Sequence, residues 1–141
     1  MTDEPDHIVF YGSLRRGEAN FERLGLGRRL GFVRPARIDG ALYDLGDYPG
    51  LVIEARGQVQ GELYRILDPS VLADLDAYEL FRPGDPAPFH RATGRGSLYL
   101  RTAIPVGADR AFVYVLNGLP RSAPRVTGGD WLRHKALRRR R

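Results

Sequence analysis

HIVFYGSLRRG, residues 7–17, is the stretch from which the fold can be worked out. Residues 8–11 are all apolar, β-branched or aromatic, and a short run of this kind is typical of a buried strand. The run stops at Gly12-Ser13, and Gly17 punctuates the loop that follows. A strand that breaks at a glycine can turn backbone N–H groups outward, where they bind an anion or a developing oxyanion. The alternative is an ordinary turn, with glycine present because its φ is positive.

Further short strands are expected along the chain. Apolar and polar residues alternate in 58–67, which is the pattern of a half-buried strand. Strands are also expected at 28–33, 36–45, 51–55, 97–106 and 110–116, with 51–55 and 58–67 forming a hairpin at Gly57. Helices are expected at 18–24, from Asp68 to about Leu80, and from Asp130 onward. This order predicts an α+β domain, a small mixed β-barrel of short strands with two or three flanking helices.

The expected helix after Asp68 carries a carboxylate on its apolar face. At about 100° per residue, Glu79 falls within the arc that also holds Leu72 and Leu75. A carboxylate on a buried face must be paired, or desolvation raises its pKa, and a raised pKa suits a general acid/base at neutral pH. The alternative is that Glu79 lies at a frayed helix end and reaches solvent or an arginine such as Arg82.

The positive charge of the chain is concentrated at its end. The net charge is +5, and six of the basic residues fall within 133–141. Without them the chain has 16 basic and 17 acidic residues, so the body is close to neutral. We therefore expect a single domain at 1–132 and a basic tail at 133–141, with any contact to a polyanion made through the tail.

Several classes of site are disfavoured by composition and spacing. There is no cysteine, and the three histidines lie in separate segments, so no metal site is predicted. The N-terminal residues are acidic and polar, and no apolar run approaches the ~18 residues of a spanning helix. These features predict a soluble, cytoplasmic protein that does not contact a membrane.

An ordered set of motifs resembles the γ-glutamylcyclotransferase family, which includes the γ-glutamylamine cyclotransferases. The motifs are YGSL at 11–14, YPGLV at 48–52, QGELY at 60–64, LDAYE at 75–79 and VYV at 113–115. The resemblance implies the family's small mixed barrel and an enzyme that closes a γ-glutamyl group to 5-oxoproline and releases an amine. No cofactor is implied, because the substrate's own amino group is the nucleophile.

The resemblance also implies roles for individual residues. Glu79 is the implied proton acceptor, and the substrate-binding residues are Tyr11, Gly12, Ser13, Leu14, Tyr114 and Arg91. Arg91 comes from the sequence Phe89-His90-Arg91, which stands where family members often have Tyr-x-Arg. Two alternatives remain: a non-catalytic small-molecule binding module on the same scaffold, and a protein that associates with nucleic acid through its basic tail.

Overall fold

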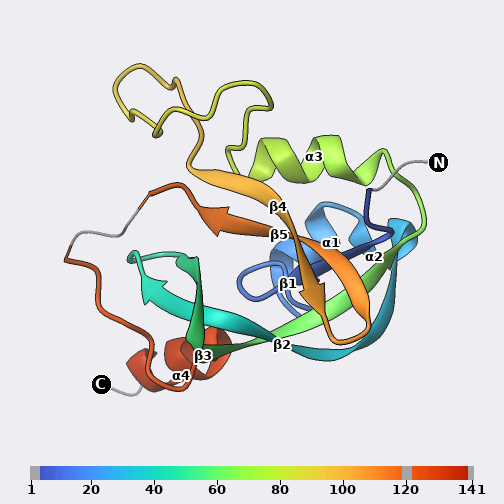
Figure 1. Ribbon diagram of the computed structural model, residues 1–141, viewed down its shortest axis with the longest axis horizontal. Helices are drawn as coiled ribbons and strands as arrows, with labels where there is room; N and C mark the ends of the chain where they lie inside the picture. The colour runs from blue at the N-terminus through green and yellow to red at the C-terminus, as the bar shows by residue number, and fades with distance from the viewer. Residues whose placement is uncertain (1–3, 119–121, 140–141) are drawn as a thin grey trace.

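The structure is a computed structural model that describes residues 4–118 and 122–139. The described residues form one five-stranded sheet and four helices (Figure 1). The strands are β1 (His7–Phe10), β2 (Leu30–Asp44), β3 (Pro49–Ile66), β4 (Tyr99–Val106) and β5 (Asp109–Leu116). The helices are α1 (Ala19–Arg23), α2 (Leu26–Arg29), α3 (Val71–Tyr78) and α4 (Trp131–Arg139).

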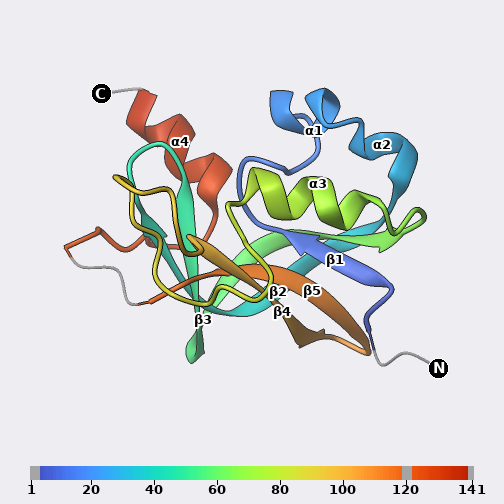
Figure 2. The same cartoon turned by 90° about the horizontal axis from the view of Figure 1, so that it is seen from above.

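The strand predicted from the opening stretch is the centre of the sheet. The strand order is β2-β3-β1-β5-β4, and β1 runs antiparallel to β3 and parallel to β5. Alternate residues of β1 enter two different cores, as the two faces of a strand require. Ile8 and Phe10 pack with α2 and α3, whereas Val9 packs in the cluster that contains Trp131 of α4. In Figure 2, α1, α2 and α3 lie together over β1, and α4 lies apart from them beside β3.

The α+β class is confirmed, but the strands and helices differ from the expectation. The sheet is not closed into a barrel, and β2 and β3 span 15 and 18 residues. The two strands expected around Pro35 are one strand, with an irregularity between Phe32 and Arg34. Four helices are present in the described part of the chain, two of them only 5 and 4 residues long.

The hairpin expected at Gly57 is not formed. Residues 49–53 and 58–66 both pair with β2, so they belong to one strand, and the intervening residues bulge opposite Asp39 and Gly40. A Cβ on Gly57 would lie 2.3 Å from the carbonyl oxygen of Gly40. Glycine is therefore required at this position by the close approach of the neighbouring strand, and not by a turn.

The predicted basic tail is helical over most of its length. The expected boundary at residue 132 falls inside α4, and residues 140–141 lie outside the described residues. His134 and Arg138 both bind the Asp44 carboxylate at the end of β2, at 2.8 and 2.7 Å.

No helix within the described residues is both long and apolar enough to cross a membrane.

Candidate active site

A cavity of about 280 Å³ lies between the end of β1 and the end of α3. Residues 9–14 form one side, and residues 78–80 form another. Tyr48, Pro49, Leu98, Tyr99 and Tyr114 complete the lining. Among the described lining residues, Glu79 is the only one with a charged side chain. The cavity is therefore an apolar and phenolic space with a single carboxylate.

Glu79 is the C-cap residue of α3, so the helix end fixes its position. Its backbone N–H donates to the carbonyl of Leu75 at 2.9 Å, and its side chain is partly buried. Within the described residues, the carboxylate has no hydrogen-bond or ion-pair partner. Burial raises the pKa of Glu79 to about 8, because desolvation disfavours the ionised form. This pKa is suited to a group that both accepts and returns a proton near neutral pH.

Four tyrosines of the cavity remain neutral beside this carboxylate. Burial is the largest cause that raises the pKa of Tyr11, Tyr78, Tyr99 and Tyr114, and the charge of Glu79 raises each of them further. The hydroxyl of Tyr11 donates to the carbonyl oxygen of Tyr114 at 2.6 Å. The phenols therefore keep their protons near neutral pH and can donate hydrogen bonds.

The loop after β1 carries unused backbone donors on residues that line the cavity. The N–H of Arg15 donates to the carbonyl of Gly12 at 3.1 Å, which closes a turn. The N–H groups of Gly12, Ser13 and Leu14 donate to no acceptor within the described residues. Neighbouring amides of this kind can hold a carboxylate or an oxyanion.

Glycine is required at position 12 because another segment comes close to it, and not because of its φ. The φ of Gly12 is not positive, whereas that of Gly17 is 91°, so the alternative of a turn glycine with positive φ is wrong for Gly12. A Cβ on Gly12 would lie 2.8 Å from Cγ of Pro49, which lines the cavity from the other side. The absence of a side chain at Gly12 therefore allows the loop after β1 and residues 48–49 to approach each other at the cavity.

Glu62 of β3 fixes the point where this loop leaves the sheet. Its Oε1 accepts from the N–H of Arg16 at 2.6 Å and from the hydroxyl of Tyr64 at 2.8 Å. The guanidinium of Arg15 lies 3.7 Å from the second carboxylate oxygen and binds Asp130 at 2.9 Å. These contacts tie the loop to both β3 and the start of α4.

Asp76 is a buried carboxylate that the sequence did not single out as part of the site. It accepts a hydrogen bond from the hydroxyl of Tyr114 at 2.7 Å and lies 3.4 Å from Nε of Arg101. Burial raises the pKa of Asp76, while the hydrogen bond from Tyr114 and the charge of Arg101 act in the opposite direction. Asp76 does not line this cavity, but its hydrogen bond holds the hydroxyl of Tyr114, which is a lining residue. Its position within the LDAYE motif at 75–79 is the sequence feature that could have indicated Asp76 as part of the site.

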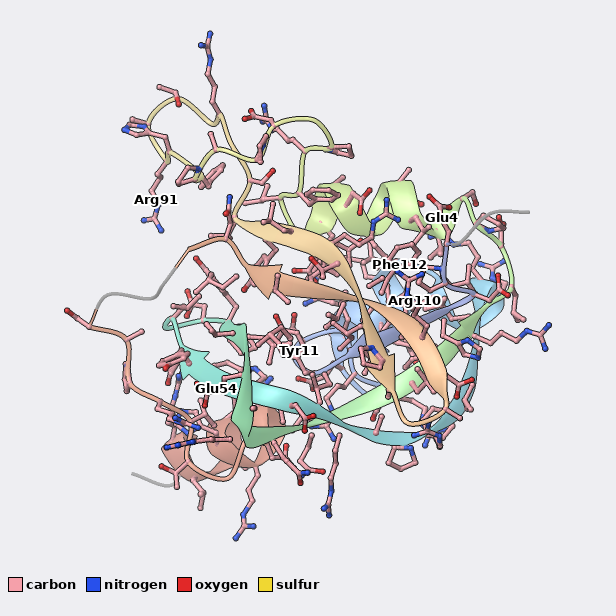
Figure 3. The ribbon with its side chains drawn as sticks, in the orientation of Figure 1. Glu4, Tyr11, Glu54, Arg91, Arg110 and Phe112 are labelled. Carbon is pink, nitrogen blue, oxygen red and sulfur yellow. The ribbon has the colours of Figure 1, made fainter. Side chains whose placement is uncertain are left out.

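Six of the seven predicted site residues come together. Glu79, Tyr114 and residues 11–14 all line the cavity, although their roles there stay predictions. Arg91 is the exception, because it is exposed on the loop between α3 and β4. Figure 3 shows it far from Tyr11, at the outer part of that loop. The structure gives Arg91 no place in the cavity, and it has no part in the function proposed below.

The loop that carries Arg91 is held by polar contacts at its base. Ser97 is fully buried and its hydroxyl donates to the carbonyl of Asp85 at 2.8 Å. Asn117 donates to the carbonyl of Pro86 at 3.0 Å.

Across the described ranges, no three His, Cys, Asp or Glu side chains are grouped so that they could hold a metal ion.

Comparison with known proteins identifies the family. The model of the family described as gamma-glutamyl cyclotransferase, AIG2-like, matches residues 8–133. The chain belongs to this family. The resemblance seen in the motifs is thereby confirmed, and the match includes every residue of the cavity lining.

Individual relatives agree with the family match. A Vibrio cholerae protein named "Putative gamma-glutamylcyclotransferase" is 36% identical over 126 residues, which are 89% of this chain and 95% of that protein. A gamma-L-glutamyl-butirosin B gamma-glutamyl cyclotransferase of Niallia circulans is 36% identical over 80 residues, 56% of this chain and 49% of that protein. The crystal structure of an AIG2-like protein from Mus musculus has a TM-score of 0.65 at 24% identity, covering 91% of this chain and 88% of that one. These names support gamma-glutamyl cyclotransferase activity.

Proposed function

We propose that this protein converts a γ-glutamyl compound to 5-oxoproline and releases the attached amine, with Glu79 moving the proton. The observation that carries the proposal is the pairing of one unpartnered carboxylate with the free amides of Gly12, Ser13 and Leu14 around the same cavity. The family match and the names of the relatives support the reaction class.

The reaction needs few protein groups, and each has a candidate here. The α-amino nitrogen of the substrate attacks the γ-carbonyl carbon and forms the bond that closes a five-membered ring. The bond from that carbon to the leaving nitrogen then breaks, and one proton passes from the attacking nitrogen to the leaving nitrogen. Because the attack is intramolecular, folding the substrate into the reactive conformation supplies much of the rate enhancement.

The cavity can meet the electrostatic requirements of these steps. The substrate's α-carboxylate and the oxyanion on the γ-carbonyl both need donors, and the amides of residues 12–14 supply them. The raised pKa of Glu79 favours a carboxyl group that can take the amine proton and return it to the leaving nitrogen. The neutral phenols around it leave Glu79 as the group that carries the proton.

The test is release of 5-oxoproline from a panel of γ-glutamyl amino acids and γ-glutamyl amines. Glu79→Gln keeps the size of the side chain but cannot carry a proton, so turnover should fall by about 10² to 10⁴. Asp74→Asn is the matched control, because Asp74 is exposed on α3 and pairs with Arg29 away from the cavity. Its turnover should equal that of the unchanged protein.

Two results would contradict the proposal in different ways. A folded Glu79→Gln protein with near-normal release of 5-oxoproline would exclude this residue as the proton carrier. Tight binding of γ-glutamyl compounds with no release of 5-oxoproline from any of them would favour the non-catalytic binding module.

A further inference from the structure

The turn that joins β2 to β3 is bound by two side chains of α4. The side chain of Asp44, the last residue of β2, is 10% exposed. Its Oδ2 accepts from a guanidinium N–H of Arg138 at 2.7 Å and lies 2.8 Å from Nε2 of His134. The same guanidinium nitrogen donates to the carbonyl of Gly46 at 2.9 Å. Figure 2 shows α4 beside this part of the sheet.

Asp44 accepts these hydrogen bonds as an ionised carboxylate. Burial acts to raise the pKa of Asp44. The hydrogen bonds from His134 and from the N–H of Gly46, with the hydrogen bond and charge of Arg138, outweigh burial, so the pKa is lowered. Hydrogen bonds to an ionised group are shorter and stronger than those between neutral groups. The contact between α4 and the turn is therefore a firm one.

The other end of this turn is a wall of the cavity. Tyr48 is the last residue of the turn and Pro49 is the first of β3, and both line the cavity. The N–H of Leu45 donates to the carbonyl of Tyr48 at 3.0 Å, and the N–H of Gly46 donates to Oδ1 of Asp44 at 2.8 Å. These bonds make the turn a compact unit, so its position at Asp44 determines its position at the cavity.

Close contacts on the cavity side make the position of this wall matter. The hydroxyl of Tyr99 donates to the carbonyl of Pro49, and the rings of Tyr48 and Tyr99 meet edge to face with their centroids 6.4 Å apart. Cγ of Pro49 is also the atom that a Cβ on Gly12 would approach to 2.8 Å. A displaced turn would therefore change the shape of the cavity, whereas Glu79 is held separately by α3.

Other contacts keep α4 itself in place. Trp131 is fully buried in the core cluster that contains Val9. Lys135 pairs with Glu18 at 2.5 Å. We therefore expect α4 to stay docked when one of its contacts to the turn is removed, so that the effect on the turn can be measured by itself.

We propose that His134 and Arg138 of α4 are positioning residues for the reaction. Acting through Asp44, they fix the turn before β3 and thereby the cavity wall formed by Tyr48 and Pro49. This inference rests on the proposed function, since the cavity is the one in which that reaction takes place. Because the wall contacts the substrate without taking part in proton transfer, its position affects binding more than the chemical step.

Arg138→Gln tests the proposal through separate measurement of KM and kcat for 5-oxoproline release. KM should rise about tenfold while kcat changes less than about twofold, because a contact made equally in the bound substrate and the transition state is lost. Arg138→Lys should restore KM to within about threefold, since a single nitrogen of Arg138 makes both bonds and an ammonium group has three donors. His134→Leu should also raise KM, whereas His134→Gln keeps an N–H donor and should not.

The matched control is Arg133→Gln, which removes the same charge from the same helix. Arg133 is exposed, and its side chain has no hydrogen-bond or ion-pair partner within the described residues. Its KM should equal that of the unchanged protein. Trp131 is the single tryptophan of the chain, so its fluorescence emission reports whether α4 remains docked in each variant.

A double-mutant cycle tests whether Arg138 acts through Asp44. Asp44→Asn should raise KM by a similar factor, and the double variant Asp44→Asn/Arg138→Gln should be no worse than the weaker-binding single variant, because both changes break the same contact. Effects on KM that multiply in the double variant would overturn the inference.

Two other results would overturn the inference and leave the proposed function standing. One is an unchanged KM in folded Arg138→Gln. The other is a KM that rises only in variants whose Trp131 emission shifts to longer wavelength, because the helix would then have been lost. Absence of 5-oxoproline from every substrate of the panel with the unchanged protein would overturn both the inference and the proposed function.

Discussion

Replacing Glu79 by glutamine should stabilise the protein, and the gain should depend on pH. Glutamine has the same shape but no charge, so it removes the cost of ionising a carboxyl group in a partly buried, unpartnered position. Below about pH 4.5 the carboxyl group is neutral in both the folded and unfolded chain, and the two proteins should be equally stable. As the pH rises toward 8, the unfolded chain ionises while the folded one keeps its proton. The stability of the unchanged protein therefore falls relative to the variant over this window.

The size of the effect follows from the pKa. A pKa of about 8 against an ordinary value of 4.5 sets an upper bound of about 5 kcal/mol, at ~1.4 kcal/mol per pH unit. Glu79 is partly open to the cavity, and solvent there reduces the penalty, so we expect about 2–3 kcal/mol. For a chain of this length, roughly 3 °C of Tm accompanies each kcal/mol, which gives a difference of about 6–9 °C above pH 8.

The assay is thermal unfolding of both proteins at half-unit steps from pH 4.5 to 9. The control is Glu22→Gln, because Glu22 is exposed on α1 and does not line the cavity, so its substitution should change Tm little. A difference between Glu79→Gln and the unchanged protein that is the same at pH 5 and pH 8.5 would refute the reasoning. It would mean that the Glu79 carboxylate is solvated or paired in the folded protein.

Three further predictions concern the same site. The kcat/KM for 5-oxoproline release should fall about tenfold per pH unit below about pH 8, because the ionised form of Glu79 accepts the proton; a rate independent of pH from 6 to 8 would contradict this. Gly12→Ala should lower kcat/KM at least tenfold, with a Tm loss of a few degrees, because the new Cβ would lie 2.8 Å from Cγ of Pro49. Asp76→Asn should destabilise the protein by about 2–3 kcal/mol in urea unfolding, since Arg101 loses its carboxylate partner in a partly buried position.

The sequence predicted those parts of the fold that depend on local patterns. The buried strand at β1, the helix that ends near Glu79 and the helix that begins near Trp131 all follow from periodicity and capping residues. Glu79 could be predicted as a candidate because helical spacing alone places it on an apolar face.

Other features depend on contacts between distant segments. Gly57 has the composition of a hairpin turn, but β2 is long enough to pair with residues on both sides of it. The bond between Asp76 and Tyr114 joins residues 38 apart in the chain, and no local pattern indicates it. The position of Arg91 is set by a loop whose base is held by Ser97 and Asn117, so a motif alignment could not place it.

Two destabilising features meet at one helix end, and this concentration is itself an argument for function. The unpartnered Glu79 costs about 2–3 kcal/mol when ionised, and Leu80, which lies in the left-handed region at φ 54°, costs about 1–2 kcal/mol more. Together they are a large share of the 5–15 kcal/mol by which a typical domain is stable. Glutamine and glycine at these two positions would remove both costs without changing the backbone. Proton transfer by Glu79 explains why a carboxylate is kept at the first of these positions, whereas a purely structural role does not.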